Sequence, residues 1–220
     1  LLTASEAYPA LERAFLAAES EIWASFLVFD LSTRLRSPEA LAIGKTWFDL
    51  VVHTLNREVS LHVSISDVDP IARAAMHRAA TRQMRMFSAA AAVANPGVKL
   101  QVMRARHPAE TGALIRLAIW PYIMKKVFRT AGWLNGLSPE HRAAALRDMD
   151  GAARNLRIRS DGTVAPRLWS LPRLYPAVHH QKLAVIDRKL LYIGGLDLDE
   201  RRYDTPNHGR AGNQTWHDVQ

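Results

Sequence analysis

The chain has 220 residues, 48% of them hydrophobic and 23% charged, which is enough for one large or two small domains with a buried core and excludes wholesale disorder. Its 29 Lys and Arg outnumber its 21 Asp and Glu, and the resulting net charge of +8 favours phosphate-bearing partners such as lipid headgroups or nucleic acid. The absence of cysteine excludes disulfide scaffolds, thiolate nucleophiles and cysteine-ligated metal sites.

The N-terminal region alternates between helix and strand patterns. Thr3 and Glu6 form a capping-box pattern, which predicts a helix that runs to about residue 19. Residues 22–29 are nearly continuous in apolar side chains, which predicts a strand covered on both faces. The Ser-Pro-Glu sequence at 37–39 then predicts the start of a second helix, with Ser at the N-cap and Pro at the first helical position.

The next segments continue this alternation and indicate the fold class. Residues 59–65 and 98–102 alternate between apolar and polar side chains, which predicts two strands with one buried face each. Between them, Asp69 and Pro70 predict the start of a helix that runs through an Ala-rich stretch to Ala94, with Asp69 as its N-cap in preference to a metal ligand. We therefore expect an α/β/α layered domain, in which a mixed, largely parallel sheet is flanked by helices on both faces.

Residues 105–170 interrupt this pattern, and we expect them to be a helical and loop insertion within one domain that spans 1–220. A helix is predicted around 110–131, with a kink near Pro121, and a second helix begins at Ser138. The segment 114–133 interleaves basic with aromatic residues. It is either an amphipathic helix that packs on the core or a surface that docks on anionic lipid, and both interpretations stay open.

The residues that suggest chemistry lie near the C-terminus. Two apolar runs, Leu183–Ile186 and Leu190–Ile193, predict two strands joined by a tight turn at Asp187. His180 and Lys182 are separated by one residue, so in an extended strand they share a face. Histidine can act as nucleophile or proton donor in phosphoryl chemistry, while lysine neutralises phosphate oxygens. Asp187 either orients a histidine or caps the turn.

These residues form part of a longer pattern. Gly194 and Gly195 follow the second strand, and glycine there allows the backbone to approach a ligand or another strand closely. The pattern His180-x-Lys182-x-x-x-x-Asp187 followed by Gly194-Gly195-Leu196-Asp197 resembles the HKD signature of the phospholipase D superfamily. The wider run, through Arg202-Tyr203-Asp204-Thr205 to Trp216-His217-Asp218, resembles the first of the two motifs in its lipid-type members.

The resemblance implies a metal-independent phosphodiesterase without a cofactor, in which two motifs meet in one active site. One histidine attacks phosphorus and forms a phosphohistidine, the partner histidine protonates the leaving alcohol, and water or another alcohol then resolves the intermediate. It further implies that His180 is the reactive histidine, Lys182 the phosphate ligand and Asp187 the acidic member of the motif. The implied substrate-binding residues are Gly194, Gly195, Asp197, Trp216 and His217.

The pattern also departs from the family. Gly195 and Asp197 stand where Ser and Asn are usual, which resembles the first motif of two-motif enzymes, and no second His-x-Lys occurs in the 220 residues. We therefore expect the chain to be the N-terminal half of a longer protein, which pairs with a second HKD half in the same chain or in a homodimer. A monomer of this chain alone is expected to be inactive.

The leading hypothesis is an enzyme that cleaves or transfers phosphatidyl groups of phospholipids at a membrane surface. The alternatives are a nuclease of the same superfamily and a non-catalytic half-domain for binding or assembly. Trp216 and His217 either pack or line the substrate channel. A zinc site that uses His179, His180, His217 and Asp218 is the weakest alternative. We expect a cytoplasmic or peripheral-membrane location, since the sequence shows no signal-peptide pattern and no membrane-spanning run.

Overall fold

The computed structural model describes residues 1, 3–209 and 211 and divides the chain into two compact units. Unit 1 comprises Leu1–Ser66, Gln83–Ala105 and His180–Gln220, and unit 2 comprises Asp67–Arg82 and Arg106–His179. Within the described residues, the helices are too short or too polar to cross a lipid bilayer.

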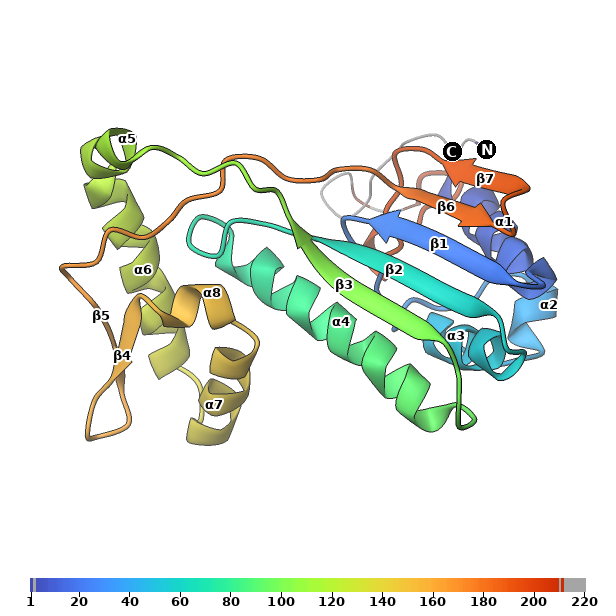
Figure 1. The fold of residues 1–220 in the computed structure, drawn as a ribbon, viewed down its shortest axis with the longest axis horizontal. Coiled ribbons are helices and arrows are strands. Elements are labelled where there is room, and N and C mark those ends of the chain that lie inside the picture. Colours follow the sequence, from blue (N-terminus) through green and yellow to red (C-terminus); the bar gives the residue numbers. More distant parts are fainter. Residues whose placement is uncertain (2, 210, 212–220) are drawn as a thin grey trace. The chain divides into compact units, whose positions relative to one another are not determined.

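Unit 1 is built on a five-stranded sheet with the strand order β3-β2-β1-β6-β7 (Figure 1). The strands are β1 (Glu21–Phe26), β2 (Ser60–Asp67), β3 (Leu100–Arg106), β6 (Leu183–Ile186) and β7 (Leu190–Ile193). β1 pairs in parallel with β2 and antiparallel with β6, which in turn pairs antiparallel with β7. The predicted α/β fold class, a mixed and largely parallel sheet with flanking helices, is therefore confirmed.

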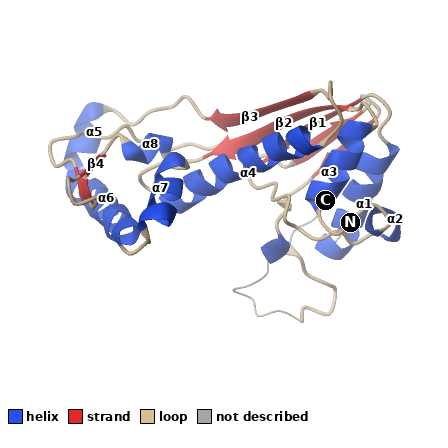
Figure 2. Ribbon diagram, turned by 90° about the horizontal axis from the view of Figure 1, so that it is seen from below, coloured by secondary structure: helices blue, strands red, loops and turns tan. Residues whose placement is uncertain are grey.

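The helices of this unit are α1 (Ala4–Ala17), α2 (Pro38–Leu41), α3 (Trp47–Asn56), α4 (Ala74–Val93), which begins in unit 2, and the short 3-10 helix η1 (Glu200–Arg202). Figure 2 shows that α1, α3 and α4 lie on one face of the sheet and not on both, which differs from the predicted α/β/α layers. Aromatic rings fill the space between these helices and the sheet, with edge-to-face contacts of Phe29 to Phe15, Trp47 and Phe87. The core of unit 1 therefore lies on this face.

The expectation that β1 is covered on both faces is wrong. Ile22, Ala24 and Phe26 are buried, but Trp23 between them is 47% exposed and stacks on His62 of β2 with 3.9 Å between the ring centroids. Other exposed side chains of the sheet strands are Met103, Leu191 and Ile193. The apolar run does not reveal this exposure, because Trp23 is apolar yet lies on the sheet face that carries these exposed residues.

Helix starts were predicted with mixed success. The capping box at Thr3 and Glu6 is wrong, because the Thr3 hydroxyl bonds to Ser5 Oγ and makes no cap bond, although α1 does begin at the next residue. A capping box is instead found at Thr46 and Asp49, which begins α3.

Of two further predicted helix starts, the one at Ser37 is confirmed. The one at Asp69 is wrong because the helix begins only at Ala74, although it ends at Val93, next to the predicted Ala94. Ser37 caps α2 as predicted, since its hydroxyl accepts the Ala40 N–H at 3.2 Å, but that helix ends after a single turn. The Asp69 carboxylate accepts the N–H groups of Ile71 and Ala72, as an N-cap would. The residues that follow form a turn, and α4 begins only at Ala74.

Unit 2 contains α5 (Ala113–Ala118), α6 (Trp120–Asn135), α7 (Pro139–Arg147), α8 (Asp150–Ala153) and the hairpin of β4 (Leu156–Ile158) and β5 (Val164–Pro166). The single kinked helix predicted around 110–131 is wrong, because the structure has two helices there. Pro121 lies in the first turn of α6, where a missing N–H costs no helical hydrogen bond. Ser138 caps α7 as predicted, with its hydroxyl accepting the His141 N–H.

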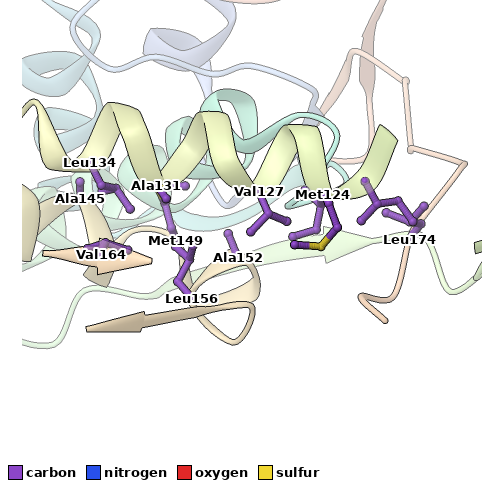
Figure 3. Close-up of a cluster of buried hydrophobic side chains, with 12 residues drawn as sticks. Met124, Val127, Ala131, Leu134, Ala145, Met149, Ala152, Leu156, Val164 and Leu174 are labelled. Carbon is purple, nitrogen blue, oxygen red and sulfur yellow. The ribbon is translucent and has the colours of Figure 1, made fainter. Parts of the chain in front are cut away.

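The second unit has its own hydrophobic core, against which α6 packs one face (Figure 3). The buried members are Ile71, Ile123, Met124, Val127, Ala131, Leu134, Ala145, Met149, Ala152, Leu156, Val164 and Leu174. Five of them come from α6 at helical spacing, so this helix is amphipathic and packs on a core, as one of the two interpretations predicted.

Candidate active site

His180 and Lys182 lie in the extended segment that leads into β6. The strand begins only at Leu183, so the two residues stand outside the sheet ladder. The His180 side chain is exposed, whereas Lys182 is only 3% exposed. The Lys182 ammonium lies 3.5 Å from His180 Nδ1 and donates a hydrogen bond to the His180 carbonyl at 3.1 Å. The structure thus brings the imidazole and the ammonium together, as the spacing predicts.

A buried carboxylate holds this lysine. Lys182 Nζ lies 3.5 Å from Asp197 Oδ2, and the side chain of Asp197 is as deeply buried as that of Lys182. The other carboxylate oxygen of Asp197 accepts the Val28 N–H at 2.9 Å. Burial raises the pKa of Asp197, while the Val28 N–H and the charge of Lys182 act against this rise. Asp197 therefore lies beside the Lys182 ammonium and positions it.

Tyr8 supports the same corner of the site and was missed at the sequence level. Its hydroxyl donates to the backbone carbonyl of Asp197 at 2.7 Å and also lies 3.0 Å from the carbonyl of Asp199. Burial is the main cause that raises the pKa of Tyr8, so this hydroxyl stays protonated and remains a donor. The sequence feature that could have indicated this role is the hydroxyl group of Tyr8, which lies within the apolar stripe of α1 that also contains Leu11 and Phe15.

The two glycines lie next to this arrangement. Gly194 directly follows β7, and its N–H donates to the backbone carbonyl of Lys182 at 3.1 Å. Gly195 follows in the bend that leads to Asp197. Gly194 thus extends the backbone pairing of the hairpin to the segment that carries His180 and Lys182, which is the close approach of another strand that the sequence suggests.

Asp187 lies at the opposite end of β6 from His180. Its carboxylate accepts the backbone N–H groups of Glu19, Ser20 and Glu21 at 2.8–2.9 Å. Burial alone would raise the pKa of Asp187, but the hydrogen bonds from these residues outweigh it and hold the pKa well below the ordinary aspartate value. The structure brings Asp187 to the start of β1 and away from His180, so its contacts match neither expected role: the carboxylate ties the β6–β7 turn to the residues that lead into β1.

The remaining predicted residues lie apart or outside the description. Trp216 and His217 fall outside the described residues. His179 points to a different neighbour from His180, because its ring centroid lies 5.1 Å from that of His107 within unit 2. Among the residues that the structure describes, no cluster of three or more His, Asp or Glu side chains could hold a metal ion.

Comparison with known proteins gives one short similarity. No protein-family model matches the chain. A stretch of 30 residues is 57% identical to phospholipase D1 of Schizosaccharomyces pombe, which corresponds to 14% of this chain and 2% of the yeast protein. The chain thus spans a small fraction of this relative, and the likeness to a phospholipase D is local.

Proposed function

We propose that this chain carries one HKD motif of a phospholipase D-like phosphodiesterase, which cleaves or transfers phosphatidyl groups through a phosphohistidine. The observation that carries the proposal is an exposed His180 beside the ammonium of Lys182, which the buried carboxylate of Asp197 holds in place. The local identity with a yeast phospholipase D supports the same class of enzyme.

Lys182 would stabilise the charge of the phosphoryl oxygens. Its ammonium is fixed by Asp197 and by the His180 carbonyl, so it needs little reorganisation when a phosphate binds next to the imidazole. A partly desolvated ammonium also interacts more strongly with a phosphate oxygen than one in bulk water does.

His180 would form or assist the covalent intermediate. In the first step a ring nitrogen attacks phosphorus, an N–P bond forms and the P–O bond to the leaving alcohol breaks, while a second histidine gives its proton to the departing oxygen. In the second step water or another alcohol loses a proton to that histidine, its oxygen bonds to phosphorus and the N–P bond breaks. One histidine cannot serve both roles at once, so a second HKD half, from the same chain or from a homodimer partner, would complete the site.

The other residues would have supporting roles in this proposal. Asp187 keeps the hairpin of β6 and β7 attached to β1, while the Gly194 N–H keeps its far end close to Lys182. The substrate surface would be a phospholipid membrane, which implies a peripheral-membrane location.

The test compares three forms of the intact protein: wild type, His180→Ala and the matched control His179→Ala. Each is incubated with phosphatidylcholine and phosphatidylglycerol vesicles and with single-stranded DNA, in the presence of EDTA. We expect lipid cleavage that survives EDTA, falls by at least about 10³-fold in His180→Ala and persists in His179→Ala.

Each other outcome redirects the assignment. Full activity of His180→Ala, or cleavage that EDTA abolishes, would contradict the proposed chemistry. Cleavage of DNA alone would make the protein a nuclease. Inactivity of the intact protein on every substrate would support the non-catalytic binding module.

A further inference from the structure

The face of α6 that points away from the core of unit 2 carries aromatic and basic side chains. Tyr122, Lys125, Arg129 and Trp133 follow one another at spacings of three and four residues, so they form one stripe along the helix. All four are exposed. Because the opposite side of α6 is packed into the core, this stripe is held facing solvent.

The stripe is positively charged and has no acidic counterpart nearby in the sequence. Between Glu110 and Glu140 the chain contains four basic residues and no Asp or Glu. Among the described residues, Lys125 and Arg129 form no ion pair with a carboxylate. Their charges are therefore available to an anionic partner.

The helix that precedes the stripe exposes large aliphatic side chains. α5 has no buried residue, and Leu114, Ile115 and Leu117 are 84%, 59% and 63% exposed. A soluble surface rarely carries three such residues within four positions, and exposed apolar groups of this kind mark sites of interaction with a partner or a membrane.

A pocket beside the stripe adds donors for a phosphate. It has a volume of about 240 Å³ and is lined by Arg78, Arg129, Thr130 and Trp133 together with three apolar residues of unit 2. The Arg78 guanidinium lies over the Trp133 ring, 4.6 Å from its centroid. Two arginines and a threonine thus line one pocket, and guanidinium and hydroxyl groups are donors to the oxygens of a lipid headgroup phosphate.

We propose that α5 and the exposed stripe of α6, here called the α5–α6 surface, dock on an anionic lipid bilayer. The aliphatic side chains of α5 would enter the acyl boundary, Tyr122 and Trp133 would lie at the headgroup level, and the basic residues would attract anionic lipid. The charge of the surface is what selects an anionic bilayer over a zwitterionic one. The purpose of docking rests on the proposed function, whereas binding to vesicles can be measured without turnover.

The test is co-sedimentation of the intact protein with vesicles of phosphatidylcholine alone or mixed with phosphatidylglycerol. The background is His180→Ala, so that the lipid is not consumed. The α6 variant, Lys125→Gln with Arg129→Gln, removes two charges from the α5–α6 surface. The α5 variant, Leu114→Ser with Leu117→Ser, removes two of its aliphatic side chains. The matched control, Lys99→Gln with Lys189→Gln, removes two exposed charges from unit 1.

We expect binding that depends on phosphatidylglycerol. Each cation close to an anionic surface raises the affinity about fivefold, so the α6 variant should bind at least about tenfold more weakly than the control variant. The α5 variant should also bind more weakly. Circular dichroism should show unchanged folding in all forms, because the substituted side chains are exposed.

Three results would contradict the proposed docking: equal binding to both vesicle types, an equal loss of vesicle affinity in the α6 variant and the control variant, or no vesicle binding at all. Dimerisation that the α5 variant abolishes, without any vesicle binding, would assign the surface to a second copy of the chain instead. Vesicle binding in a protein that proves inactive on lipid would count against the proposed function and leave the docking surface standing.

Discussion

Asp187 provides a sharp test of how unit 1 is held together. We predict that Asp187→Ala destabilises the protein but leaves the specific activity of the folded molecules unchanged. The carboxylate accepts three backbone N–H groups and the Ser20 hydroxyl, and it joins the β6–β7 turn to the beginning of β1. Its contacts lie at the end of β6 remote from His180, so the substitution should not disturb the imidazole.

The magnitude follows from the number and exposure of these bonds. A hydrogen bond to a charged group contributes about 1.5–3 kcal/mol when buried, but Asp187 is only half-buried and water can replace part of each bond. About 0.5–1 kcal/mol for each of the four lost bonds gives a decrease in the free energy of unfolding of about 2–4 kcal/mol. A suitable control is Asp30→Ala, which removes only the local bonds to the N–H and hydroxyl of Ser32.

Urea denaturation at neutral and acid pH is the assay. Because the folded-state pKa of Asp187 lies below its usual value, its stabilising effect is present above the ordinary aspartate pKa and disappears as the pH falls through the folded-state value. The difference in the free energy of unfolding between wild type and Asp187→Ala should therefore be largest near neutral pH and decrease in acid. A loss no larger than that of Asp30→Ala, or a loss of specific activity to the level of His180→Ala, would refute this account of Asp187.

Three further substitutions probe other parts of the structure. Leu134→Ala, at a fully buried position in the unit 2 core, should lower the free energy of unfolding by about 3 kcal/mol in urea titration. Lys182→Met should abolish activity and cost about 3 kcal/mol at neutral pH, because it leaves the Asp197 carboxylate buried without its cation. This cost should shrink in acid, where Asp197 is protonated. Arg188→Gly should instead raise stability by up to about 1 kcal/mol in a thermal melt, since Arg188 has φ of 55°.

The strands nearest the candidate site were predictable because local patterns determine them. The bounds predicted for β6 and β7 agree with the structure, since two apolar runs flank a polar turn in which Asp187 and Arg188 both adopt positive φ. β1 was not predictable to the same degree. A run of apolar residues cannot show which sheet face stays open, and the position of Trp23 is decided by the strands and helices around it.

The candidate site divides in the same way. His180 and Lys182 are two residues apart, so their proximity follows from local geometry. The Tyr8 hydroxyl donates to the Asp197 carbonyl, but the two residues are 189 positions apart in the sequence. No local sequence pattern could predict this contact. The supporting residues of the site could be identified only once α1 and the segment after β7 were placed in one unit.

The order of segments along the chain has a consequence for how the protein is made. One edge of β1 pairs with β2, which follows it closely in the sequence. The other edge pairs with β6, and the hydrogen bond from the Glu21 N–H to Asp187 joins residues that are 166 positions apart. At roughly 5–20 residues per second of synthesis, that edge stays open for on the order of 10–30 s. β6, which pairs with this edge, is synthesised directly after His180 and Lys182. A chain whose synthesis stops before this point therefore has an unpaired edge on β1 and lacks both candidate site residues. Such nascent chains are natural clients for chaperones.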